Sequence, residues 1–275
     1  MTDKPSLKAA FEAPEVKRRY VRRLFATIAD RYDLITVLLS FARDRHWKAQ
    51  LLDLTEVRSG WRVLDLACGT GDIAFEAARR GTAVTGLDIT PRMVELAREK
   101  EKTTSGDVFP LAGTEPDARG RFLISWIVGD MIALPIASGC FDLVTTGYGL
   151  RNVSDLPRAL AEIHRVLKPG GRMGSLDFDR PDARWVRRIY LGYLTAVGSA
   201  LGWILHRDPD TYRYIPASIR RYPGARGVAA LMHDAGFIDV VNVPVFGGFM
   251  AIHLARKPAS TPEGRSPSVP DARCT

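Results

Sequence analysis

A glycine-rich turn near residue 70 has the residue types and spacing of a ligand-binding site. The apolar run Arg62–Ala67 is typical of a buried strand, and it leads through Gly69-Thr70-Gly71 into a helical pattern that begins at Asp72. Glycines let a backbone approach a ligand closely, and the first turn of a helix offers unpaired N–H groups. This stretch therefore predicts a turn whose backbone binds a small molecule.

Two carboxylates indicate which small molecule the turn would accept. Asp88 ends the next predicted strand, nineteen residues beyond Gly69, where it can bind both ribose hydroxyls of an adenosine. The pattern Gly69-x-Gly71-x-x-Ala74 also satisfies the dinucleotide fingerprint, so an NAD-dependent oxidoreductase is an alternative. Asp65 argues against it, because a carboxylate aimed at the turn would repel a pyrophosphate. It would suit a cationic amino group, such as that of S-adenosylmethionine.

Further signals follow in order along the chain. Gly129-Asp130 ends the third predicted strand, where a carboxylate can accept from an adenine amino group, and residues 167–171 read Leu-Lys-Pro-Gly-Gly. With Asp65, Asp88 and Phe141-Asp142, this ordered set resembles the class I S-adenosylmethionine-dependent methyltransferases. The resemblance implies S-adenosyl-L-methionine as the cofactor, without a metal. It assigns cofactor binding to Asp65, Gly69, Thr70, Gly71, Asp88, Asp130, Met131 and Gly147.

Motifs outside the cofactor half narrow the resemblance. Residues 25–34 read Phe-Ala-x-Ile-Ala-x-Arg-Tyr-Asp-Leu, residues 148–153 read Tyr-Gly-Leu-Arg-Asn-Val, and residues 212–219 contain Tyr-Arg-Tyr followed by Ser-Ile. From about residue 24 to 256 the chain resembles the ubiquinone/menaquinone biosynthesis C-methyltransferases. It departs from their pattern at Thr36, at Asp44 and His46, and at Asp177-Phe178-Asp179. These departures bear on the acceptor rather than the cofactor, so another lipophilic or aromatic acceptor is an alternative.

The family resemblance implies methyl transfer to a ring carbon of a prenylated quinol, of the demethylmenaquinol-to-menaquinol type. That carbon becomes nucleophilic when the neighbouring hydroxyl loses its proton, and it must be held about 3–3.5 Å from the sulfonium methyl. Arg151 is the candidate for stabilising the phenolate, because a guanidinium stays charged. Asn152 would orient the ring oxygen, and Tyr32 and Asp33 would remove or position a proton. The alternatives are a helix-cap and salt-bridge role for Arg151 and Asn152, and a core position for Tyr32.

The elements that must position these residues alternate between strand and helix patterns. We expect strands at 62–67, 83–87, 122–128, 141–146 and 172–178, and helices at 72–80, 91–102, 154–167, 184–206 and 228–235. Ser154 is the expected N-cap of the third of these helices. Such alternation predicts an α/β fold, a single Rossmann-like, doubly wound, mostly parallel seven-stranded sheet. Residues 237–245 and 249–255 predict a C-terminal antiparallel hairpin, and N-terminal helices and a helical lid insertion complete the fold.

The domain organisation follows from these elements. We expect a basic N-terminal arm at 1–23, a methyltransferase domain at 24–257 and a disordered tail at 258–275. Within the domain we expect N-terminal helices at 24–59, the cofactor-binding core at 60–180, the acceptor lid at 181–224, and a closing helix and hairpin at 225–257.

Composition and charge limit the partners. The 275 residues carry 39 Lys+Arg against 31 Asp+Glu, a net charge of +8, which invites an anionic partner such as nucleic acid, a phosphorylated substrate or a membrane surface. A nucleic-acid methyltransferase is disfavoured, because zinc spacing is absent and the basic run Lys17–Arg23 has a single interleaved aromatic. The sparse cysteines (Cys68, Cys140 and Cys274) and the lack of an apolar segment at the start indicate a cytoplasmic protein.

The uncharged run Ile189–Leu205 follows the basic residues Arg187-Arg188 and predicts an apolar helical lid. Such a lid would cover an isoprenoid chain, while the basic residues would meet lipid headgroups. The expected partners are therefore a lipophilic quinol and, at the inner face of the membrane, an anionic bilayer, without nucleic acid. Packing of this helix on the sheet is the alternative, and self-association into a homo-oligomer is also open.

Overall fold

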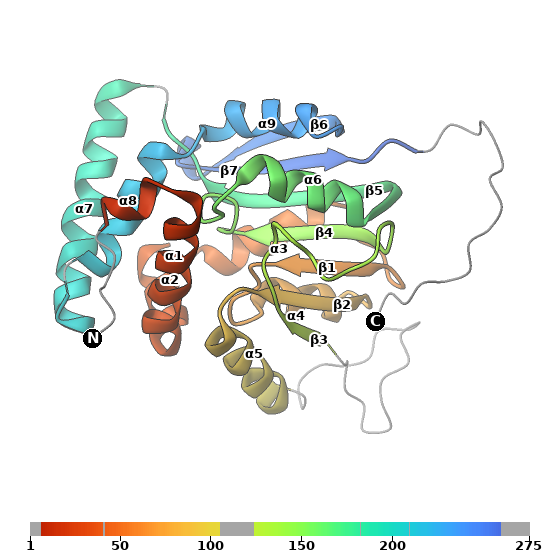
Figure 1. Ribbon diagram of the computed structural model, residues 1–275, viewed down its shortest axis with the longest axis horizontal. Coiled ribbons are helices and arrows are strands. Elements are labelled where there is room, and N and C mark those ends of the chain that lie inside the picture. Colours follow the sequence, from red (N-terminus) through yellow and green to blue (C-terminus); the bar gives the residue numbers. More distant parts are fainter. Residues whose placement is uncertain (1–6, 41, 105–123, 182, 209, 260–275) are drawn as a thin grey trace.

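The computed structural model describes residues 7–40, 42–104, 124–181, 183–208 and 210–259. Within these ranges seven strands form one sheet, in the order β3-β2-β1-β4-β5-β7-β6 (Figure 1). The strands are β1 (Arg62–Leu66), β2 (Ala83–Asp88), β3 (Ser125–Val128), β4 (Phe141–Gly147), β5 (Leu167–Phe178), β6 (Ile238–Val245) and β7 (Met250–Arg256).

The first five strands run parallel, and β7 lies antiparallel to both β5 and β6. The chain order reverses between β1 and β4, so the carboxyl ends of these strands meet at a switch point where α/β folds bind ligands. Val63, Leu64 and Leu66 of β1 are wholly buried, since helices cover both faces of a parallel sheet. The prediction of a mostly parallel, doubly wound seven-stranded sheet with a C-terminal hairpin is confirmed.

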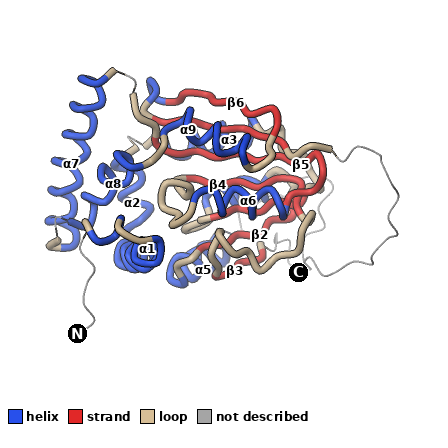
Figure 2. The backbone as a smooth tube through the Cα atoms, turned by 45° about the horizontal axis from the view of Figure 1, so that its top comes forward, coloured by secondary structure: helices blue, strands red, loops and turns tan. Residues whose placement is uncertain are grey.

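Helices form a layer on each face of the sheet (Figure 2). One layer contains α3 (Asp44–Leu54), α4 (Asp72–Arg79) and α5 (Pro91–Thr104), and the other contains α6 (Leu156–Val166) and α9 (Gly224–Asp234). The N-cap of α6 is Asp155, whose side chain accepts from the backbone N of Arg158 at 3.0 Å, so the expectation of a Ser154 cap is wrong by one residue. The two layers bury separate hydrophobic clusters against the two faces of the sheet.

The N-terminal segment is more structured than its basic composition indicates. A 3-10 turn, η1 (Ala9–Phe11), precedes α1 (Pro14–Ile28), which continues through η2 (Ala29–Arg31) into α2 (Tyr32–Leu39). The expected boundary of an arm at residue 23 falls inside α1 and is wrong. Tyr20 and Val21 of α1 are buried, because the helix packs its apolar face on the body while its arginines stay at the surface.

Two further helices, α7 (Arg184–His206) and α8 (Asp210–Arg221), pack together at the end of the molecule beside α1 and α2 (Figure 1). They occupy the segment expected as a helical lid. A short turn, η3 (Phe246–Gly248), joins β6 to β7. Of the tail expected to be disordered, residues 260–275 lie outside the described residues.

Candidate active site

The glycine turn lies between β1 and α4. Gly69 and Gly71 have φ angles of +55° and +91°, a conformation that glycine adopts without steric cost. A Cβ atom on Gly71 would lie 2.6 Å from Cη2 of Trp126 and 2.9 Å from Cε2 of Phe75. Gly71 therefore shapes the turn, and it lines neither cavity described below.

Asp65 lies at the end of β1, directly beneath this turn. Its Oδ1 accepts from Oγ1 of Thr145 at 3.0 Å, while its buried Oδ2 has no hydrogen-bond partner among the described residues. Burial raises the pKa of this carboxyl to about 7. An unpaired buried acceptor with a raised pKa is what a cationic group would satisfy, as the sequence predicts for the amino group of the cofactor.

Asp88 ends β2 and is fixed by the backbone. Its Oδ2 accepts from the N–H of Gly69 at 3.0 Å, and its Oδ1 accepts from the N–H of Thr90 at 2.8 Å. Burial raises the pKa of Asp88, and the two N–H groups oppose that shift. The carboxylate is thus oriented at the edge of the turn, and its remaining lone pairs are available to ribose hydroxyls.

A cavity opens at the carboxyl ends of β1, β2 and β4, and we call it the cofactor cavity. Of the residues predicted to bind the cofactor, Gly69, Asp88, Asp130, Met131 and Gly147 line it. Asp65 and Thr70 line a smaller hollow beside it that shares Gly69 and Gly147 as walls. The switch point therefore brings together every predicted cofactor residue except Gly71 at the surface of these two spaces.

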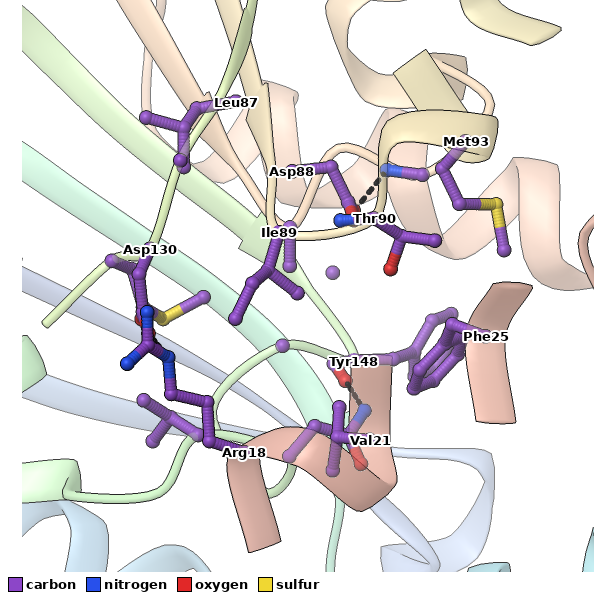
Figure 3. A pocket seen from close by; sticks show the side chains of 18 of the residues that line it. Arg18, Val21, Phe25, Leu87, Asp88, Ile89, Thr90, Met93, Asp130 and Tyr148 are labelled. Carbon is purple, nitrogen blue, oxygen red and sulfur yellow. Dashed lines mark hydrogen bonds and ion pairs between the residues drawn. The ribbon is translucent and has the colours of Figure 1, made fainter. Parts of the chain in front are cut away.

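The far wall of the cofactor cavity comes from α1, which the sequence did not assign to the site. Figure 3 shows Arg18, Val21 and Phe25 across the cavity from Asp88. The Nε of Arg18 lies 2.8 Å from Oδ2 of Asp130, so an ion pair ties α1 to the end of β3. In the sequence, this contact is indicated only by the helical spacing of apolar residues in α1 and the basic residues between them. That pattern does not say which carboxylate an arginine of α1 would pair with.

The predicted role of Asp33 in handling a proton does not fit its position. Its Oδ1 accepts from Oγ1 of Thr70 at 2.6 Å, and its Oδ2 lies 3.3 Å from Nζ of Lys100. Asp33 is half exposed and lines neither the cofactor cavity nor the acceptor cavity described next. It instead holds the start of α2 against the glycine turn.

A second and larger cavity, of about 460 Å³, adjoins the first, and we call it the acceptor cavity. Its walls are mainly aromatic and aliphatic, which suits a lipophilic ligand. They come from α1, α2, α7, α8, the β6–β7 turn and the start of β7, including Phe25, Ile35, Leu39, Ile189, Tyr190, Leu194, Tyr212, Ile215, Phe249 and Met250. Phe25, Tyr32 and Tyr148 line both cavities, so the two spaces meet at these rings.

Tyr32 stands at this junction, with its Cε1 3.6 Å from where a Cβ on Gly69 would be. Burial raises the pKa of its hydroxyl to about 12. The hydroxyl therefore keeps its proton near neutral pH and can donate a hydrogen bond to a bound oxygen. Of the two roles predicted for Tyr32, this position favours orienting the acceptor over removing its proton.

Arg151 provides the charged end of the acceptor cavity. Its Nε lies 3.1 Å from Oδ1 of Asp177, and its Nη1 donates to Oγ of Ser218 at 2.9 Å. Its guanidinium carbon lies 4.9 Å from the centre of the Phe178 ring, which also lines the cavity. Nζ of Lys17 donates to the carbonyl oxygen of Arg151 at 3.1 Å, and burial lowers the pKa of Lys17 to about 8. Arg151 is thus the charged residue that lines this cavity, and Asp177 and Lys17 hold it from behind.

Asn152 is placed differently from its neighbour. Its Nδ2 donates to the carbonyl oxygen of Tyr148 at 2.7 Å, and its Oδ1 accepts from Nη1 of Arg151 at 3.2 Å. It lines the cofactor cavity and not the acceptor cavity. These contacts fix the loop that carries Arg151, and the contact of Asn152 with the ring oxygen stays a prediction.

A buried polar group beneath the junction was also missed by the sequence reasoning. Nζ of Lys48 lies 2.5 Å from Oδ2 of Asp44 and 2.9 Å from Oδ2 of Asp72. Burial alone would lower the pKa of Lys48, but the two carboxylates outweigh it and hold that pKa above its usual range. The hydroxyl of Tyr148 donates to Asp44 at 2.7 Å, so this group fixes one ring of the junction.

The fold and the site together define a class I S-adenosylmethionine-dependent methyltransferase. The sheet order, the glycine turn, Asp88 at the end of β2 and the unpaired carboxylate oxygen of Asp65 fit this cofactor. The chain belongs to the ubiE/COQ5 methyltransferase family, whose sequence profile matches residues 13–257.

Individual relatives agree with this assignment. A ubiquinone/menaquinone biosynthesis C-methyltransferase UbiE from Methylobacterium nodulans is 39% identical over 246 residues, which cover 88% of this chain and 92% of that protein. A demethylmenaquinone methyltransferase from Thermus thermophilus is 36% identical over 237 residues, 86% of this chain and all of that protein.

Solved structures confirm the fold at much lower identity. A SAM-dependent methyltransferase from Thermotoga maritima superposes with a TM-score of 0.57 at 19% identity, over 86% of this chain and 99% of that one. A SAM-dependent methyltransferase from Aquifex aeolicus gives a TM-score of 0.52 at 16% identity, over 76% and 88%.

Proposed function

We propose that this enzyme methylates a ring carbon of a prenylated quinol in menaquinone or ubiquinone biosynthesis, with S-adenosyl-L-methionine as the methyl donor. The observation that carries the proposal is the junction at Tyr32 and Tyr148, where the cofactor cavity, with the carboxylates of Asp88 and Asp130, meets a large apolar cavity with Arg151 at its charged end. The names of the relatives from Methylobacterium nodulans and Thermus thermophilus support the same substrate class.

The acceptor cavity suits both parts of such a substrate. A prenyl chain gains free energy from burial against apolar walls, at about 25 cal/mol for each Å² removed from water. The ring, which carries hydroxyl groups, would lie at the end of the cavity that contains Arg151 and Tyr32. A small soluble acceptor would leave most of the 460 Å³ unfilled.

The charges at that end favour the reactive form of the ring. The guanidinium of Arg151 opposes the effect of burial on a nearby phenolic hydroxyl, because a cation stabilises the phenolate and so lowers its pKa. The phenolate pushes electron density to the adjacent ring carbon, which is then the nucleophile. The neutral hydroxyl of Tyr32 can donate to a ring oxygen and so hold that carbon towards the cofactor cavity.

The bound cofactor supplies an electrophilic methyl group on a sulfonium. The protein's contribution is to align the two ligands and to keep water away from the junction. Phe25, Tyr32 and Tyr148 surround the point where the cavities meet. Under this proposal the enzyme works in the cytoplasm, on an acceptor that partitions into the membrane.

The test is to incubate the enzyme with radiolabelled S-adenosylmethionine and three acceptors, a demethylmenaquinol, a polyprenyl-methoxybenzoquinol and a lipid amine. We expect label in one or both quinols and none in the amine. The oxidised quinones serve as a matched control, because they lack the hydroxyl that activates the ring, and they should stay unlabelled. Label in the amine alone, or in none of the acceptors, would contradict the proposal.

A further inference from the structure

The outer face of α7 exposes large apolar side chains along its length. Trp185, Ile189, Tyr193, Trp203 and Ile204 are exposed by 70, 64, 45, 68 and 67%. The first three follow at intervals of four residues, which places them on one side of the helix. The other exposed positions between Ile189 and Ile204 carry no charge. An apolar surface of this extent is unusual for a solvated helix and marks an interaction site.

The opposite face of α7 is fixed to the body. Leu191, Leu194, Gly198 and Gly202 are buried, and a Cβ on Gly198 would lie 3.2 Å from Cβ of Tyr212 in α8. The 23 residues of α7 are long and apolar enough to cross a membrane by composition alone. Because one face packs closely on α8, the helix is placed to lie on a bilayer rather than to span it.

The charges on α7 indicate which kind of surface the helix would bind. The helix contains no aspartate or glutamate, and its first turns carry Arg184, Arg187 and Arg188. None of these three arginines forms an ion pair with any residue that the structure describes. Exposed tryptophans near both ends of a basic, apolar helix are typical of helices in the interface of an anionic bilayer.

The helix α2 extends this surface. Leu34, Val37 and Leu38 are exposed by 53, 41 and 50%. The guanidinium of Arg31, just before α2, donates to the carbonyl oxygen of Leu205 in α7, and Figures 1 and 2 both show the two helices at the same end of the molecule. We call the exposed apolar residues of α7 and α2 the apolar face.

The acceptor cavity reaches this face. Trp185, Ile189 and Tyr193 are among the exposed residues of α7, and all three also line the cavity. Ile35 and Leu39 of α2 line it from the other side. A ligand that left the cavity between α7 and α2 would therefore emerge at the apolar face.

We infer that the apolar face docks on an anionic lipid bilayer, and that the acceptor enters the cavity from the bilayer between α7 and α2. This inference rests on the proposed function for the identity of the acceptor, but the docking itself does not depend on it. α7 would lie flat in the interface, its tryptophans among the headgroups and its arginines on lipid phosphates.

The experiment measures co-sedimentation of the full chain with vesicles of phosphatidylcholine and phosphatidylglycerol, with vesicles of phosphatidylcholine alone for comparison. The test variant is Trp203→Glu/Ile204→Glu, because these residues are exposed and do not line either cavity. We expect it to weaken binding to the anionic vesicles at least about tenfold. The matched control Ile238→Glu/Val241→Glu adds the same charge to exposed apolar positions on β6 and should bind as the unmodified enzyme does.

Activity assays separate the docking from the proposed function. With a long-chain quinol in vesicles, turnover by Trp203→Glu/Ile204→Glu should fall in parallel with binding, whereas turnover of a short-chain, water-soluble quinol should be unchanged. If the unmodified enzyme ignores anionic vesicles yet methylates the soluble quinol, the docking is wrong and the proposed function stands. If it binds vesicles and methylates neither quinol, the proposed function fails and the docking stands.

A second copy of the chain is the other occupant to test. Analytical ultracentrifugation without lipid should show a monomer for both the enzyme and the variant. A dimer that the Trp203→Glu/Ile204→Glu change dissociates, together with no vesicle binding, would overturn the inference, because the apolar face would then be a protein–protein interface.

Discussion

The cofactor cavity and the acceptor cavity share the rings of Tyr32 and Tyr148 but are built by different means. The inner wall of the cofactor cavity is made of strand ends and a glycine turn, with carboxylates held by backbone N–H groups. The acceptor cavity is made of side chains from helices that lie far apart in sequence, and its charged groups are few.

This difference separates the part of the site that binds the cofactor from the part that determines which acceptor is methylated. A backbone turn with oriented carboxylates recognises one cofactor and tolerates little change, because its geometry depends on particular φ angles and short contacts. An apolar wall of side chains can be altered one residue at a time without affecting the turn. Changes in the two regions should therefore affect different measured quantities, and the following predictions test that separation.

The largest effect should come from Arg151→Lys, which keeps a charge beside Asp177 but removes the planar guanidinium. We expect kcat to fall about 100- to 1000-fold, as for loss of an oxyanion-stabilising group, with little change in cofactor affinity. Single-turnover kinetics and calorimetry measure the two quantities. Ser218→Ala, which removes only one hydrogen bond to Arg151, is the control and should cost far less. An unchanged kcat in Arg151→Lys would remove this residue from the chemistry.

The next largest effect should be on the affinity for the cofactor alone. Asp88→Ala removes a buried carboxylate and leaves the N–H groups of Gly69 and Thr90 without their acceptor. We expect the Kd for S-adenosylmethionine to rise about fiftyfold, since charge-assisted hydrogen bonds contribute 1.5–3 kcal/mol. Calorimetric titration checks this against Asp142→Ala, which breaks a pair with Lys168 away from both cavities and should leave the Kd unchanged. Normal binding by Asp88→Ala would count against the site.

A smaller effect should appear in the stability of the fold. Gly71→Ala places a methyl group against Trp126 and Phe75 at contact distances that no folded chain accepts without movement. Gly60→Ala is its control, because Gly60 has a similar positive φ of +81° but open space around it. We expect the free energy of unfolding to fall by about 2 kcal/mol more in Gly71→Ala, as for overpacking of a core. Equal losses in the two variants would mean that backbone strain alone matters at the turn.

The smallest expected effect is a dependence of stability and of cofactor affinity on pH. The pKa of Asp65, raised to about 7, means that the folded, cofactor-free protein holds this proton more tightly than the unfolded chain. The free energy of unfolding should therefore fall as pH rises from about 4 to 7. A bound cation needs the carboxylate form, so cofactor affinity should rise up to about tenfold per pH unit as pH approaches 7.

Asp65→Asn is the matched variant for this titration. It keeps the shape of the side chain and an acceptor for Thr145 but cannot ionise. Its cofactor affinity should be independent of pH over the same interval and weaker at neutral pH. A pH dependence that survives in Asp65→Asn would assign the titration to another group.

The sequence predicted the sheet and the inner wall of the cofactor cavity because these depend on order along the chain. Asp65 lies on a predicted strand, Asp88 and Asp130 each follow one, and parallel strands bring their carboxyl ends to one edge. Gly71 was assigned to the cofactor from its motif, but only the positions of Trp126 and Phe75 show that it serves the turn.

The outer walls could not be predicted in this way. Arg18 forms an ion pair with Asp130, which lies 112 positions further along the chain. No local sequence pattern specifies which carboxylate an arginine on the exposed side of a helix will pair with. Asp33 was assigned to removing or positioning a proton from the family motif that also contains Tyr32, yet neighbouring residues on a helix point in different directions, and Asp33 contacts Thr70. The boundary expected at residue 23 is wrong because it was drawn from the basic composition of the segment. Composition alone does not indicate the buried face of α1 that contains Tyr20 and Val21.

The position of α1 has a consequence for the order in which the protein can assemble. Several groups that this helix contacts lie more than 100 residues further along the chain: Asp130, the carbonyl oxygens of Arg151 and Val153, and the ring of Tyr214, 5.5 Å from that of Tyr20. Contacts between distant parts of a chain form slowly. We therefore expect α1 to dock late in folding, so that the outer wall of the cofactor cavity forms after its inner wall.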